Sequence, residues 1–78
     1  MEGQIRDYID MKVNNFIGRI ELAGKNRDGL AAWCEVDMFL DFRETIQSVL
    51  DNNSIATYTR AMGSALQNIG REDFVDLL

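Results

Sequence analysis

The sequence has no histidine and no proline, and only one cysteine among its 78 residues. Without histidine it lacks the side chain most often used as a general base and as a metal ligand. One cysteine cannot close an internal disulfide, and without histidine it leaves no ligand set of the usual zinc type. These absences exclude the commonest hydrolytic and zinc-dependent sites. We therefore expect a protein that is not an enzyme and that holds no metal and no cofactor.

Long apolar runs are also missing. No run reaches the roughly 18 residues that a transmembrane helix needs, so we expect no membrane span. The first residues, Met1 to Arg6, include an acid and lack the pattern of a secretory signal. A lone cysteine suits a reducing compartment. Together these features predict a cytoplasmic protein.

Basic residues are few, since eight Lys and Arg stand against 13 Asp and Glu for a net charge of −5. Residues 1–27 contain four acids and five bases (+1), residues 28–51 six acids and one base (−5), and residues 52–78 three acids and two bases (−1). A nucleic-acid-binding surface needs clustered bases, so we expect no direct binding to nucleic acid. The acidic middle segment is better suited to a basic surface on another protein.

What the sequence does have is helical periodicity. Apolar residues recur every three or four positions in residues 2–23, 29–51 and 54–69, and residues 72–78 have room for one further helical turn. The two clearest stripes are Ile5, Ile9, Val13, Phe16, Ile20 and Ala23, and Ile55, Tyr58, Met62, Ala65, Leu66 and Ile69. We predict an all-α fold, with residues 1–78 forming a single domain: a small three-helix bundle with a short C-terminal helical turn. A homodimer is expected because so short a chain has little core of its own.

Residues 33–42 allow a second interpretation. From Cys34 to Phe42 the sequence alternates between apolar and acidic residues, which is a strand signature, although Phe39 interrupts it. Three acids within the segment disfavour a strand, so a helix over 29–51 is our prediction. Its apolar arc comprises Ala32, Val36, Phe39, Ile46 and Leu50, with Trp33, Leu40, Phe42 and Val49 at the margins.

Local signals mark the helix ends. Asp28 is expected to cap the second helix, and Asn53 or Ser54 the third, because their side chains can accept from free backbone N–H groups. Gly70 is expected to end the third helix. The basic, glycine-containing segment 24–29 predicts a connector that ends the first helix, with a phosphate-binding loop as the alternative.

Three acids share the side of the second helix opposite its apolar arc. Asp37, Asp41 and Glu44 are spaced four and three residues apart, as on one helical face. A magnesium site is one alternative, but it needs carboxylates from a second helix, and those of the first helix lie on its outer face. We expect instead that these acids, with Trp33 as an aromatic anchor, form a partner-binding surface.

Four further features each allow two interpretations. Cys34 is expected to be a core or boundary residue, because no base stands near it to make it a nucleophile. Ser54 is expected to cap a helix, although carrier proteins bear their prosthetic group on a serine so placed. Met11 and Leu22 lie off the apolar stripe, either as ordinary exposed residues or as a second contact surface. The sparsely charged helix 54–69 is sandwiched by the first two helices or meets a second chain.

No motif in the sequence identifies a family. We hypothesise a small acidic interaction module that regulates or inhibits another protein by occupying a basic, nucleic-acid-binding surface, in the manner of inhibitors encoded by phages and mobile elements. The alternatives are a carrier or small-ligand-binding bundle and a structural dimerisation module.

Overall fold

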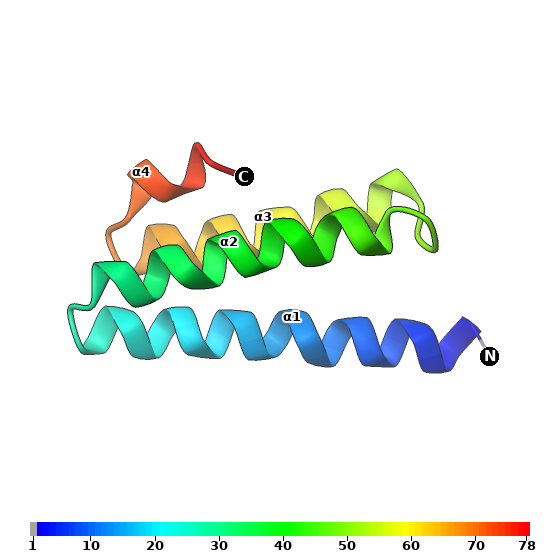
Figure 1. Cartoon of the computed structure of the whole chain (residues 1–78), viewed down its shortest axis with the longest axis horizontal. Coiled ribbons are helices and arrows are strands. Elements are labelled where there is room, and N and C mark those ends of the chain that lie inside the picture. The colour runs from blue at the N-terminus through cyan, green and yellow to red at the C-terminus, as the bar shows by residue number, and fades with distance from the viewer. Residues whose placement is uncertain (1) are drawn as a thin grey trace.

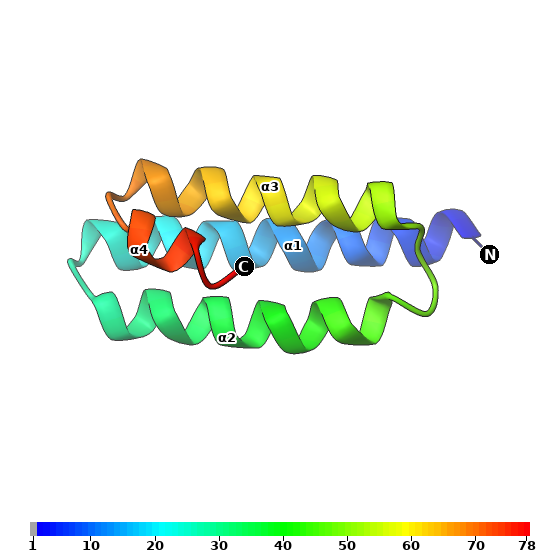
Figure 2. The same cartoon turned by 90° about the horizontal axis from the view of Figure 1, so that it is seen from above.

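Helices account for most of the computed structural model, which describes residues 2–78. The helices are α1 (Glu2–Lys25), α2 (Gly29–Ile46), α3 (Asn52–Asn68) and α4 (Glu72–Val75). In Figure 1, α1 forms one layer and α2 and α3 form a second. Figure 2 shows α2 and α3 side by side, with the short α4 over the space between them. The all-α class and the three-helix bundle with a C-terminal turn are confirmed. The segment 33–42 is helical, so its strand interpretation is wrong.

The periodic apolar residues form the core, as the stripes predict. Phe39, Ile20, Met62 and Leu66 are completely buried, and the ring of Phe16 meets that of Phe39 edge to face at 6.0 Å between centroids. The rest of the buried apolar set is Ile9, Val13, Ala23, Ala32, Val36, Ile46, Ile55 and Ala65. In this region the sequence and the packing agree.

The second helix is shorter than predicted. It ends at Ile46 rather than at residue 51, and residues 47–50 form a turn. Two hydroxyls bond to backbone carbonyls there, Thr45 to Asp41 at 3.2 Å and Ser48 to Thr45 at 3.1 Å. Such local bonds compete with helix propagation. Val49, predicted at the margin of the apolar arc, lies in this turn and is 55% exposed.

The third helix begins earlier than predicted, and its cap is Asp51 rather than Asn53 or Ser54. The Asp51 carboxylate accepts from both the backbone N–H and the hydroxyl of Ser54. At the other end Gly70 adopts a φ of 77°, and the N–H of Arg71 donates to the carbonyl of Leu66. This is the expected glycine stop of a helix.

The first helix also runs on past its predicted end. Arg27, not a glycine, takes the positive φ of 52° that ends it, and the N–H of Asp28 donates to the carbonyl of Ala23 at 2.9 Å. Gly24 has a different role, since a Cβ added there would lie 2.7 Å from the Cβ of Ile69. Glycine at this position lets α1 and α3 approach closely.

The third helix packs against α1 on one side and α4 on another, whereas the sequence allowed a sandwich between the first two helices or a contact with a second chain. Gly63 is buried beneath Val75 and Leu78 of the C-terminal segment. Arg43 of α2 donates to the carbonyl of Leu78 at 2.7 Å, which ties this segment to the second helix. Phe74 also packs against the core, so the C-terminal residues close it. None of the helices within residues 2–78 is long and apolar enough to cross a bilayer.

Candidate protein-binding surfaces

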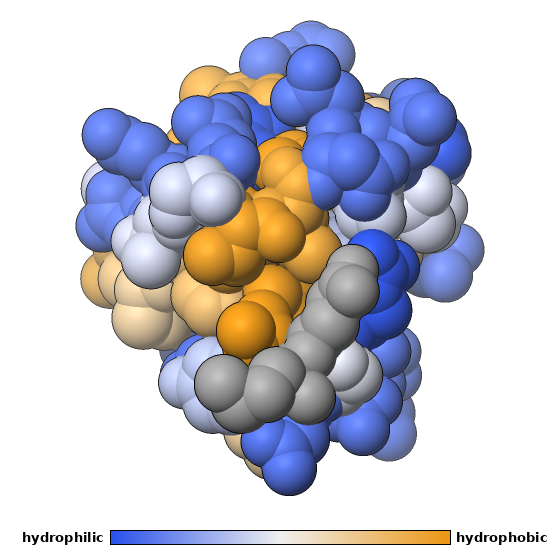
Figure 3. Space-filling view, turned by 90° about the vertical axis from the view of Figure 1, so that its right-hand side faces the viewer, coloured by the Kyte–Doolittle hydropathy of each residue, from blue (hydrophilic) through white to orange (hydrophobic). Residues whose placement is uncertain are grey.

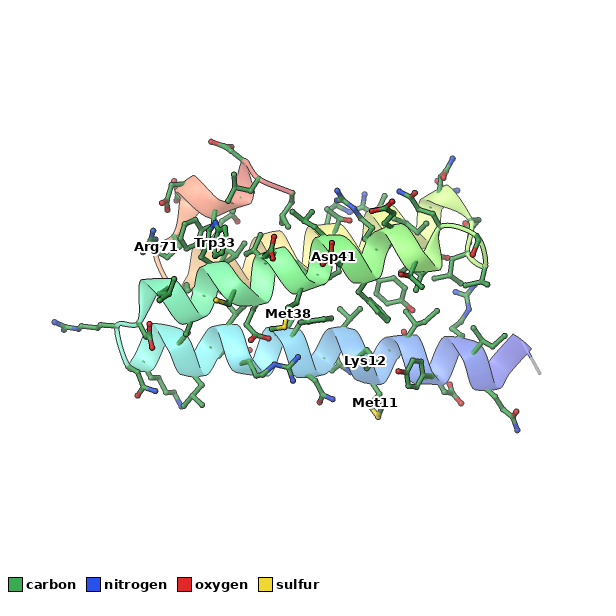
Figure 4. The ribbon with its side chains drawn as sticks, viewed as in Figure 1. Met11, Lys12, Trp33, Met38, Asp41 and Arg71 are labelled. Atoms are coloured by element: carbon green, nitrogen blue, oxygen red, sulfur yellow. The ribbon has the colours of Figure 1, made fainter. Side chains whose placement is uncertain are left out.

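Asp37, Asp41 and Glu44 of α2 are exposed, and we call them the acidic face. Their spacing of four and three residues places them on the side of α2 away from the core. Among the described residues, none of the three takes part in an ion pair. Trp33 is 44% exposed and points toward the side of the layer on which α4 lies (Figure 4). The structure thus leaves three unpaired carboxylates and an accessible indole on one helix.

Other acids of the middle segment are used inside the fold. Glu35 is buried and accepts from Arg19 of α1 at 2.5 Å, while the Arg19 guanidinium lies 5.1 Å from the centroid of the Phe16 ring. Sequence reasoning missed this pair. Its signal was the position of Glu35, three residues after Ala32 and four before Phe39, which is the apolar side of the helix. Glu35 therefore contributes to the packing of α1 against α2 and not to the acidic face.

Asp51 is also engaged, as the cap of α3. The Ser54 hydroxyl that donates to its carboxylate holds the pKa of Asp51 below its usual value, and Arg6 lies 4.0 Å away. The same hydroxyl accepts from Arg6 at 3.3 Å. The Ser54 hydroxyl thus belongs to the start of α3, and its bond from Arg6 connects α3 to α1.

The structure gives little support to two ligand sites that the sequence left as alternatives, a magnesium site and a phosphate-binding loop. Within residues 2–78 there is no group of three or more Cys, Asp and Glu side chains that could hold a metal ion. The connector borders a hollow of about 220 Å³ between Gly24, Gly29 and Arg71. However, Asp28 caps α2 by accepting from Ala31, and Arg71 pairs with Asp73 through two bonds of 2.9 and 3.1 Å. Two of the groups that would bind a phosphate there, the Ala31 N–H at the start of α2 and the Arg71 guanidinium, therefore already have partners.

The exposure of three further residues bears on what the sequence predicted for them. Cys34 is exposed, so its expected place in the core or at its boundary is wrong. Met11 and Leu22 are 49% and 57% exposed, and Met11 points away from the bundle in Figure 4. Both are exposed, as their position off the stripe predicts.

A second surface, which sequence reasoning missed, is an open groove of about 460 Å³ between α1 and the end of α2. Its exposed apolar side chains are Ile5, Tyr8 and Val49, at 46%, 54% and 55%. The remaining lining residues are Ile9, Lys12, Phe42, Thr45, Ile46 and Ser48. Figure 3 looks at the end of the bundle that holds the start of α1, and it shows hydrophobic surface in the middle of that end.

The groove lies beside the end of α2 at Ile46. The sequence placed Ile5 on an apolar stripe, which predicts burial, and Val49 at the margin of an apolar arc. Val49 lies in the turn after α2 and lines the groove together with Ile5, and apolar periodicity does not encode this helix end.

Comparison of the chain with protein-family models, with curated proteins and with solved structures found no match.

Proposed function

We propose that this protein is a non-enzymatic, cytoplasmic interaction module that binds a basic surface of another protein through the acidic face of α2. The observation that carries the proposal is that Asp37, Asp41 and Glu44 are exposed and unpaired within the described residues, while Glu35 and Asp51 on the same segment have partners. Charges that the fold does not use are free to steer and hold a partner. Trp33 supplies an adjoining aromatic surface of the kind that anchors interfaces.

The proposed partner is a protein with clustered Lys and Arg, such as one that binds nucleic acid. Occupying its phosphate-binding surface would make this chain a regulator or inhibitor, a role suited to proteins of phages and mobile elements. An anionic helix can neutralise such a surface without any catalytic group.

A pull-down from the native cell with the tagged chain tests the proposal. The test variant is Asp37→Lys with Glu44→Lys. A matched control, Glu21→Lys with Asp76→Lys, makes the same change of charge at two exposed acids elsewhere. We expect a basic protein to be captured by the unmodified chain and the control but lost with the test variant, and to be released by high salt. Equal capture by both variants, or no basic protein at all, would contradict the proposal.

A further inference from the structure

We propose that the open groove is a docking surface for a second copy of this chain, with α1 of one protomer lying over α2 of its partner. The docking surface consists of the groove and of the adjoining exposed face along the line where α1 and α2 meet, and we call the whole the seam face. Its exposed apolar members are Ile5, Tyr8, Met38 and Val49, at 44% to 55% exposure. Figure 4 shows Met38 between the two helices, with Lys12 on α1 and Asp41 on α2 to either side of it.

The size of the seam face suits a dimer. The bundle has principal extents of 39 × 20 × 17 Å, so a face two helices wide along its full length offers about the 800 Å² per partner that specific interfaces bury. A chain of 78 residues also has little core of its own, and a second copy supplies more buried apolar surface.

The charges on the seam face select how the two copies pack. The α1 side carries Lys12, and the α2 side carries Asp41, neither of which forms an ion pair in the part of the chain that the structure describes. A two-fold axis across the helices would place α1 against α1 and bring like charges together. A two-fold axis parallel to the helices places α1 against α2 of the partner, so that basic meets acidic. The complementary arrangement is the second one.

The positions along the helices make this pairing specific. Helices α1 and α2 are antiparallel, with Arg19 level with Glu35 at one end and Ile5 beside Val49 at the other. Lys12 lies between these levels and lines the groove together with Phe42 and Thr45. In the proposed dimer Lys12 therefore faces the partner's Asp41, and by symmetry the pair occurs twice, which leaves Asp37 and Glu44 of the acidic face free for the basic partner. The two ion pairs lie at the same level along the bundle, and the apolar residues of the two seam faces cover one another on either side of that level.

Exchanging the charges tests this arrangement directly. Lys12→Glu and Asp41→Lys each turn both ion pairs into repulsions, and we expect each to weaken the dimer by roughly tenfold or more. An equimolar mixture of the two variants behaves differently. In the heterodimer the carboxylate introduced at position 12 of one protomer faces the ammonium introduced at position 41 of the other, and the native Lys12 faces the native Asp41. Circular dichroism checks that each variant keeps its helical content.

Sedimentation equilibrium on the purified full chain provides the readout. We expect a dimer for the unmodified protein, monomers for each variant alone, and a dimer again for their mixture. A monomeric unmodified protein, as a groove reserved for a different partner would give, overturns the proposal. Variants that dimerise as well alone as mixed also overturn it. The variant Asp37→Lys with Glu44→Lys is expected to remain dimeric, so the loss of partner binding and the loss of the dimer can be told apart.

Discussion

The contact of α1 with α3 differs from its contact with the end of α2. Toward α3, the contact is closed by Gly24 against Ile69 and by polar pairs, with Tyr58 donating to Asp10 and Arg6 to Ser54. Toward the end of α2, the contact opens into a groove lined by exposed apolar side chains. The side of α1 that faces α3 is therefore covered within the chain, whereas the side near the end of α2 has exposed apolar residues.

This difference between the two sides of α1 indicates which side is available to bind another molecule. On the α3 side, the polar groups and the close backbone approach are matched within the chain, which is what a purely structural contact requires. On the α2 side, Ile5, Tyr8 and Val49 remain about half exposed beside Lys12, which has no ion-pair partner within residues 2–78. Exposed apolar side chains grouped in one place mark an interaction surface better than scattered ones do.

The largest expected effect on stability is the difference between a buried and an exposed isoleucine of α1. Ile20 is completely buried and Ile5 is 46% exposed, on the same helix. We expect Ile20→Ala to lower the free energy of unfolding by about 2–5 kcal/mol, because it leaves a cavity. We expect Ile5→Ala to lower it by less than about 1 kcal/mol at concentrations where the chain is monomeric. Urea denaturation measures both, and equal losses would contradict the contrast.

Two glycines of α1 give the next contrast. Gly24→Ala forces a Cβ against the fixed Cβ of Ile69, and we expect a net loss of about 1–2 kcal/mol after the gain in helix propensity. Gly18 has no neighbouring atom within 4 Å of an added Cβ. Gly18→Ala is therefore expected to stabilise the protein by about 0.5–1 kcal/mol. Thermal unfolding midpoints should move in opposite directions, and a stabilised Gly24→Ala variant would show that α1 and α3 do not touch there.

The smallest expected effect is confined to alkaline pH. Burial of the Tyr58 phenol and its hydrogen bond to Asp10 raise the pKa of Tyr58 to about 12, against 10.0 for a free tyrosine. Because folding favours the protonated phenol, its stabilisation is complete below pH 10 and is lost as the pH rises to about 12. The free energy of unfolding should therefore fall more steeply in this window for the unmodified chain than for Tyr58→Phe. Parallel curves for the two proteins would contradict the assignment.

Most of the fold could be predicted from apolar periodicity and from local signals. The stripe from Ile9 to Ala23 is buried as expected, as is the stripe from Ile55 to Leu66 except for the partly buried Tyr58. Asp28 and Gly70 act as the expected helix start and stop. These features depend on residues close together in sequence, which is why sequence alone reveals them.

The rest depends on contacts between distant segments or on competing local bonds. The end of α2 at Ile46 is followed by a bond from the Ser48 hydroxyl to the carbonyl of Thr45 and by the cap at Asp51, local features that the apolar pattern does not reveal. The Arg19–Glu35 pair and the seam-face groove depend on how α1 and α2 are aligned, and periodicity does not give that alignment. The acidic face was accessible to sequence reasoning because helical spacing alone defines it.

The most direct test of the account is the molar mass of the unmodified protein as a function of concentration. The chain has a mass of 8.9 kDa. If the uncovered side of α1 is a docking surface for a second copy, the weight-average mass measured by light scattering should rise with concentration and level off at twice that value. A mass that stays at the monomer value at every concentration would contradict the central claim.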